Sequence, residues 1–365
     1  MRFIPDIGVA NVQASEPAKI DAIDKKLLIA LAKDARQSLS QLARHARIGK
    51  DSTRYRINRM TTAGVIHPAR MLADVGMLGY DSYHVFLQLK NPTPQVESQI
   101  VKKLSALPFV RAVLKFFGQY DFEVAIIAKN VREFDDMLTQ IIEMTQQYLQ
   151  RHDTFVITKS YVAEAFPKSF GNSVTLAQSP ITSNNKANAK RTNKSDSKML
   201  QKKNKIEIRS LDTTDLAIIR AMRDNASQPL VAIGEKIKIH PDTITYRLRN
   251  LEKWLLLGYA PVISYAALGY TMYAVLCNIQ HLDERKEATL KTFLQINPHI
   301  LWGVKTVGRR NVLLYICVKK EEEYQQTITE LRNTFPEQIL DLDTLSAVAE
   351  YKYTLLPDIL FSSQK

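Results

Sequence analysis

Residues 20–60 read IDAIDKKLLIALAKDARQSLSQLARHARIGKDSTRYRINRM, and residues 211–251 read LDTTDLAIIRAMRDNASQPLVAIGEKIKIHPDTITYRLRNL, so that one stretch repeats the other without a gap. After a shift of one residue the repeat continues through the two Leu-Gly-Tyr sequences at 78–80 and 268–270 and through Gly118 and Gly308. Such self-similarity predicts one structural unit present twice, which we call the first and the second copy. Ten positions of the two stretches are identical: Asp21/Asp212, Asp24/Asp215, Ala30/Ala221, Ala35/Ala226, Gln37/Gln228, Leu39/Leu230, Ile48/Ile239, Asp51/Asp242, Tyr55/Tyr246 and Arg56/Arg247.

Each copy opens with a pattern of three short helices. Asp21 precedes apolar residues at helical spacing that end near Lys33, and Ser38 with Gln41 three residues later is a capping box for a second helix. A third helix is expected from about Asp51 to Ala63, and Pro241 suits the first position of its counterpart. Three short helices with a tight connection between the last two predict a helix-turn-helix.

The third helix has an apolar and a polar side. At 100° per residue Thr53, Ile57 and Met60 share one side, as Ile244, Leu248 and Leu251 do in the second copy. The opposite sides are suited to the major groove of DNA, with flanking arginines placed to reach phosphates. A solvated basic face on a purely structural helix is the alternative, and the basic run Arg44, His45, Arg47 and Lys50 is open to the same two interpretations. The residues expected to contact DNA are Asp51, Ser52, Arg54, Tyr55, Arg56, Asn58 and Arg59, and Asp242, Thr243, Thr245, Tyr246, Arg247, Arg249 and Asn250.

The rest of each copy alternates between strand and helix patterns. Strands are expected from Tyr83 onward and at about 109–116, 121–128 and 153–162, with a helix around 96–107 and another at 131–149. The second copy repeats this order, with strands near 271–280, 300–307, 311–318 and 343–353 and helices near 284–296 and 321–334. The order βαββαβ predicts a ferredoxin-like sheet covered by helices on one face, so the bare face needs a partner, for which the other copy is the nearest candidate. The fold class is therefore α+β, a winged-helix-like helix-turn-helix followed by a ferredoxin-like domain, duplicated.

This organisation divides the chain of 365 residues into six parts. An N-terminal extension (1–19) precedes the first helix-turn-helix (20–75) and the first ferredoxin-like domain (76–166). A linker (167–210), rich in Ser, Asn, Thr and Lys and almost without acids, is expected to be disordered. The second helix-turn-helix (211–265) and the second ferredoxin-like domain (266–357) follow.

Composition narrows the partners and the cellular location. A net charge of +13 favours a polyanion such as nucleic acid or acidic lipid without choosing between them. No apolar run is long enough for a bilayer crossing, and the N-terminus does not resemble a secretory signal, so a cytoplasmic protein is expected. Cys277 and Cys317 lie in apolar runs without the spacing of a metal site, which indicates buried thiols.

Both copies resemble the Lrp/AsnC family of regulators. The resemblance rests on the opening sequences at 20–24 and 211–215, on Tyr-Arg-Ile and Tyr-Arg-Leu in the third helices, on Leu-Gly-Tyr, and on Gly-Gln-Tyr-Asp at 118–121. It implies a sequence-specific DNA-binding transcription regulator, further assembly of dimers, and an amino acid or similar effector bound near the turn that holds Gly118, Tyr120 and Asp121. The second copy has Gly308-Arg309-Arg310-Asn311 instead, which removes a carboxylate partner for an effector's ammonium group. In either copy the sequence also suits an ordinary turn.

Two other functions compete with this prediction. The siroheme decarboxylases share the two-part architecture as fused pairs, but their His-Asn-Tyr phrase is replaced here by Lys115-Phe116-Phe117-Gly118. His84, His152, His281 and His299 are scattered without an acid at useful spacing, so no enzyme, no cofactor and no metal site is expected. Alternatively, the helical units no longer bind DNA and the chain only assembles with other regulators.

Overall fold

The computed structural model describes residues 16–171 and 208–362. Most of the N-terminal extension and most of the linker predicted at 167–210 therefore lie outside the described residues. Within them, each copy contains three helices, one strand, and then a four-stranded unit with two helices, as the repeat predicts.

Each helical unit begins at a capped helix. Asp21 accepts hydrogen bonds from the N–H groups of Ile23 and Asp24, and Asp212 accepts one from Asp215, so the same aspartate starts both units. The predicted Ser38–Gln41 capping box is present, whereas Pro229 begins the equivalent helix without a side-chain cap. The helices are α1 (Ala22–Lys33), α2 (Leu39–Ala46) and α3 (Lys50–Thr62) in the first copy and α6 (Thr213–Met222), α7 (Leu230–Ile237) and α8 (Pro241–Leu251) in the second.

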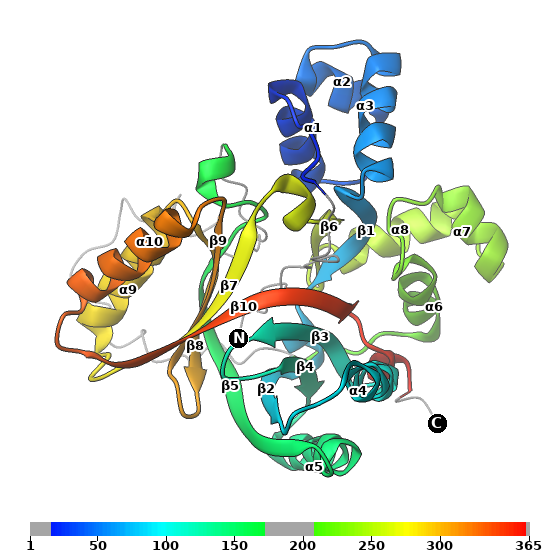
Figure 1. Ribbon diagram of the computed structural model, residues 1–365. Helices are drawn as coiled ribbons and strands as arrows, with labels where there is room; N and C mark the ends of the chain where they lie inside the picture. The colour runs from blue at the N-terminus through cyan, green and yellow to red at the C-terminus, as the bar shows by residue number, and fades with distance from the viewer. Residues whose placement is uncertain (1–15, 172–207, 363–365) are drawn as a thin grey trace, which may run out of the picture.

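A two-stranded ribbon joins the helical units. Strand β1 (Ile66–Ala73) follows α3, strand β6 (Leu256–Ile263) follows α8, and the two pair antiparallel with each other. Figure 1 shows α1–α3 and α6–α8 on either side of this ribbon. Each copy therefore completes the wing of its helix-turn-helix with a strand from the other copy.

The remaining strands form one closed eight-stranded barrel in the order β10-β3-β4-β2-β5-β8-β9-β7. Its helices lie outside the barrel wall (Figure 1), so the faces that each half-sheet leaves bare enclose the interior. The strands are β2 (Asp81–Leu89), β3 (Val110–Phe117), β4 (Phe122–Ala128), β5 (Leu149–Ala163), β7 (Thr271–Ile279), β8 (Ile300–Val307), β9 (Val312–Val318) and β10 (Ile339–Tyr353). The outer helices are α4 (Pro94–Ala106), α5 (Val131–Thr145), α9 (Glu284–Ile296) and α10 (Glu321–Thr334).

The last strand of each copy closes the barrel by belonging to both half-sheets. Strand β5 pairs with β2 of its own copy over 149–156 and with β8 of the other copy over 156–163. Strand β10 likewise pairs with β7 over 339–346 and with β3 over 346–353. Both strands begin four residues earlier than the sequence predicts, because those residues complete the ladder within their own copy.

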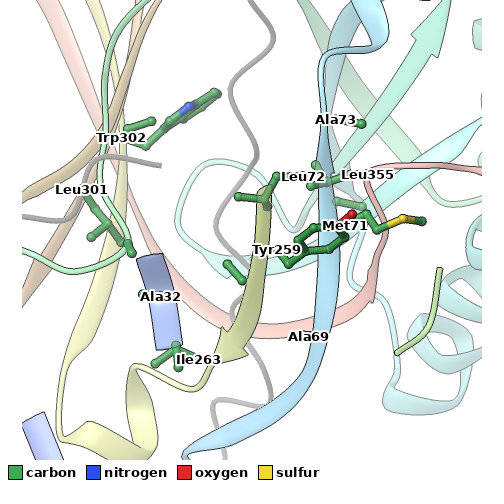
Figure 2. Close-up of a cluster of buried hydrophobic side chains, with 14 of the residues drawn as sticks. Ala32, Ala69, Met71, Leu72, Ala73, Tyr259, Ile263, Leu301, Trp302 and Leu355 are labelled. Carbon is green, nitrogen blue, oxygen red and sulfur yellow. The ribbon is translucent and has the colours of Figure 1, made fainter. Parts of the chain in front are cut away.

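One hydrophobic core runs through the helical units, the ribbon and the barrel interior. Figure 2 shows part of it, where Met71 and Tyr259 of the ribbon lie near Leu355. Two further clusters fill the spaces between the barrel wall and its outer helices. The predicted α+β fold is confirmed, and the bare face of each half-sheet faces the interior of the one closed barrel that both copies form.

The barrel interior also holds a buried polar group that the sequence did not reveal. The Nδ1 atom of His84 contacts Glu123, and the Tyr315 hydroxyl of the other copy donates to the same carboxylate. The expectation that no histidine has an acidic partner is therefore wrong for His84, because neighbouring strands β2 and β4 bring residues 84 and 123 together. His84 and Glu123 are each 1% exposed, so this pair is shielded from solvent.

The two cysteines lie where the sequence predicts, as buried thiols. Cys277 and Cys317 are buried and unbonded to each other, and burial raises the pKa of Cys277 to about 12. Among the residues that the structure describes, none of the helices is both long and apolar enough to cross a bilayer.

Candidate nucleic-acid interface

The third helix of the first copy is held by its apolar side. Thr53 and Met60 are buried, and the Thr53 hydroxyl donates to the Gly49 carbonyl at 2.9 Å. Ile57 is half-buried, so the inward side predicted from the sequence is confirmed. Six of the seven residues expected to contact DNA are exposed on the remaining surface of α3: Asp51, Ser52, Arg54, Tyr55, Asn58 and Arg59.

The third helix of the second copy repeats this arrangement. Ile244, Leu248 and Leu251 are buried, and Asp242, Thr243, Tyr246 and Arg249 are exposed. Thr245 and Asn250 are half-buried: the Thr245 hydroxyl donates to the Pro241 carbonyl, and Asn250 accepts from Lys253. The tyrosines are the most telling residues, because Tyr55 is 68% and Tyr246 64% exposed. Two large aromatic side chains at equivalent positions of a duplicated helix are thus left available to a partner.

Arg56 has partners inside its own helical unit. One of its guanidinium nitrogens donates to Asp21 at 2.7 Å and to Asp24 at 2.9 Å, and its side chain is only 20% exposed. Arg59 also pairs with Asp24, whose carboxylate is fully buried. Hydrogen bonds from the Asp24 N–H and from Arg56 lower the pKa of Asp21 to about 2. These contacts tie α3 to the start of α1.

The second copy repeats the contacts of Arg56, whereas Arg59 is replaced by Asn250. Arg247 donates to Asp212, and to Asp215 at 3.4 Å. The Asp215 N–H, with a smaller contribution from Arg247, lowers the pKa of Asp212. Arg56 and Arg247 therefore fix the angle of the third helix, and phosphate contact by these two side chains stays a prediction. The sequence contained a sign of this role, because both aspartates and the arginine are identical in the two copies.

Exposed cations surround the third helix of the first copy. All four residues of the basic run are exposed: Arg44 and His45 in the last turn of α2, Arg47 just after it, and Lys50 at the start of α3. Arg47 has a left-handed backbone with φ of 58° at the turn between the helices, as Lys238 does in the second copy. A duplex lying on α3 would meet these side chains at its backbone, where positive charge favours binding.

The turn expected to bind an effector is engaged with the rest of the barrel. Tyr120 is 1% exposed, and its hydroxyl donates to Asp153 and accepts from Arg151 at 2.9 Å. The Asp121 carboxylate accepts from the Leu89 N–H at 2.7 Å. A Cβ on Gly118 would lie 2.9 Å from the Thr344 carbonyl oxygen of the other copy.

The second-copy turn uses its different residues for a similar purpose. Asn311 bonds both the N–H and the carbonyl of Ile279, as Asp121 bonds the N–H of Leu89. Arg309 pairs with Asp153 at 3.4 Å, and Arg310 pairs with Asp343 at 2.6 Å. The two arginines thus pair with carboxylates on the long strands β5 and β10, where the two copies meet.

Comparison with known proteins assigns both helical units. The family model of the winged helix-turn-helix DNA-binding domain matches residues 20–67, and that of the AsnC-type helix-turn-helix domain matches residues 211–252. The regulatory protein AsnC of Haemophilus influenzae is 23% identical over 38% of this chain and 90% of its own length. The leucine-responsive regulatory protein of Rhizobium meliloti is 28% identical over 35% of this chain and 83% of its own length. These matches support an Lrp/AsnC-type transcription regulator with two helix-turn-helix domains.

A solved structure matches this chain over both copies. The siroheme decarboxylase NirDL has a TM-score of 0.55 and 12% sequence identity, and the match covers 92% of this chain and 94% of that one. At this identity the likeness shows the fold alone. The duplicated architecture of this chain is therefore shared with an enzyme, while the relatives found by sequence are named as regulators.

Proposed function

We propose that this chain binds double-stranded DNA as a sequence-specific transcription regulator, with α3 and α8 as its recognition helices. The observation that carries the proposal is the exposure of Tyr55 and Tyr246 on two helices that pack by their opposite sides. We also propose a cytoplasmic location, with which a DNA-binding role is consistent.

The two recognition helices differ at the positions that would read bases. Asn58 of α3 is replaced by Arg249 in α8, and Arg59 is replaced by Asn250. Asparagine pairs well with adenine and arginine with guanine in the major groove. One polypeptide would therefore recognise two unlike half-sites, about 34 Å apart if they lie one helical turn from each other.

Selection from a randomised DNA library tests this proposal. Asn58→Ala and Arg249→Ala should each relax the preference at a different half-site, at a cost of about 1–3 kcal/mol for the best sequence. Arg54→Ala, which removes an exposed cation, should weaken binding to all sequences and reduce its dependence on salt. Arg285→Ala on α9 is the control, since it removes an exposed cation of the barrel. If none of the three interface variants differs from this control, the two helices do not contact DNA.

The effector remains a separate proposal. The resemblance supports an amino acid or similar ligand near Gly118, Tyr120 and Asp121, and this ligand would have to displace Asp153 from the Tyr120 hydroxyl. Tyr120→Phe keeps the ring and removes that hydroxyl. Calorimetric titration of amino acids into the wild type and into Tyr120→Phe tests whether an effector binds through the Tyr120 hydroxyl.

We also propose that the chain is not an enzyme. The fold that it shares with NirDL supplies the alternative, a decarboxylase acting on a tetrapyrrole. Incubation with iron uroporphyrin and measurement of the Soret band tests this alternative. A saturable spectral shift with one tetrapyrrole per chain would favour the enzyme.

A further inference from the structure

A cavity of about 530 Å³ lies where the first ferredoxin-like domain meets the second helical unit. Leu78 and Tyr80 line it from the segment just before β2, Lys129 from the residue just after β4, and Leu216 from α6. Arg209, just before α6, and Leu360, in the C-terminal 3-10 helix η5 (Asp358–Phe361), complete its wall. The cavity therefore joins parts of the chain that lie far apart in the sequence, and its size is that of a small-molecule site.

The lining combines an apolar surface with positive charge. Leucine and isoleucine side chains make up half of the lining residues, and Lys129 and Arg209 are its two charged residues, with no acid among the described residues that line it. The Lys129 Nζ lies 5.4 Å from the centre of the Tyr80 ring, and the Arg209 guanidinium lies 5.8 Å from that of Trp254. Such a lining suits a ligand with an apolar body and a carboxylate. An amino acid is disfavoured, because its ammonium group would meet two cations among the described lining residues.

The other copy shows what fills the equivalent place. Tyr270 and Lys319 repeat Tyr80 and Lys129, with the Lys319 Nζ 5.0 Å from the Tyr270 ring centre. Phe170, however, stands where the first domain has Leu360, because Pro167 and Pro357 begin the same short helix in both copies. The Phe170 ring is buried, 6.5 Å from the Tyr270 ring and stacked on Phe166 at 4.4 Å.

Lysine also replaces an apolar residue in that place. Lys25 aligns with Leu216 of the cavity, and its Nζ lies 5.3 Å from the Phe170 ring centre. An aromatic ring under a lysine thus occupies one of the two equivalent positions, whereas smaller leucines line the cavity at the other. Leu360 thus takes the place of the Phe170 ring with a smaller side chain, in the wall that also contains Tyr80.

We propose that the cavity bounded by Lys129, Arg209 and Leu360 is a binding site for an aromatic monocarboxylate without an amino group. The ring lies against Leu216, Leu360 and Tyr80, and the carboxylate pairs with Lys129 and Arg209. This site goes beyond the proposed function, and its test requires no DNA.

Calorimetric titration of 3-phenylpropanoate into the full chain tests the site, with L-phenylalanine as the matched ligand that adds only the α-amino group. We expect one molecule of 3-phenylpropanoate per chain and at least tenfold weaker binding of phenylalanine. Leu360→Phe, which copies Phe170, should fill the cavity and weaken binding at least tenfold. Lys129→Met should do the same by removing a cation, and Lys319→Met is its control in the other copy.

Several results would overturn the site. One is the absence of saturable heat up to about 10 mM ligand, a concentration at which even weak sites of this size fill. Another is binding that survives both Leu360→Phe and Lys129→Met, or that falls equally with Lys319→Met. Equal affinity for phenylalanine would also contradict the proposed chemistry. Thermal unfolding of each variant without ligand separates a lost site from a misfolded protein.

Discussion

At the scale of single residues, Arg56 forms ion pairs with Asp21 and Asp24 of its own helical unit. Arg56→Ala leaves the buried Asp24 with Arg59 as its remaining cation, and we expect the free energy of unfolding to fall by about 1–3 kcal/mol. Arg54→Ala is the matched control: Arg54 and its partner Asp51 are exposed, so the expected change is under about 0.5 kcal/mol. Urea unfolding measures both. Equal losses would show that the contacts of Arg56 with Asp21 and Asp24 contribute nothing beyond a surface pair.

Asp21 adds a pH dependence at the same scale. Its pKa falls from 3.8 to about 2 on folding, so its contribution to stability is complete above about pH 4 and is lost as the pH falls towards 2. Asp21→Asn keeps a capping group without this titration. The difference in unfolding free energy between wild type and variant should therefore shrink from pH 5 to pH 2. A difference that stays constant over this range would contradict the assignment.

At the scale of elements, the turn between β8 and β9 depends on Gly308. Its φ is 154°, and a Cβ there would lie 2.4 Å from the Thr154 carbonyl oxygen on β5. Gly308→Ala should therefore lower the free energy of unfolding by about 2 kcal/mol or more, measured by thermal or denaturant unfolding. Gly49→Ala is the control, because nothing lies within 4 Å of its Cβ position and its φ is negative. If the two variants unfold alike, the turn tolerates a side chain.

Features that depend on residues close together in the sequence were predictable, and features that depend on residues far apart in the sequence were not. The Ser38–Gln41 box and the apolar side of α3 depend on neighbours within four residues, so their sequence patterns were sufficient. The contact of Arg56 with Asp24 joins residues 32 apart, and the halves of β5 choose different partners, β2 and β8. A pattern of alternating residues identifies a strand without naming its neighbours, so barrel closure and the His84–Glu123 pair were missed.

At the scale of the whole molecule, the two copies form one folding unit. We expect residues 1–190 and 191–365, produced as separate chains in one cell, to associate one to one, because each lacks the strands that close the barrel. Either chain produced alone should be aggregated or self-associated by light scattering. A stable monomer of either chain would contradict this. Sedimentation of the intact chain tests separately the prediction that these units assemble further.

The long strands β5 and β10 also bear on how the duplicated gene can change. Each half needs the final strand of its twin as its own missing edge, so neither half can be deleted when its original task becomes dispensable. Mutations can then alter what one half recognises, as at Asn58 and Arg249 or at Phe170 and Leu360, while selection still maintains that half as a scaffold. The shared strands thus allow the two copies to diverge in specificity but prevent either copy from being lost.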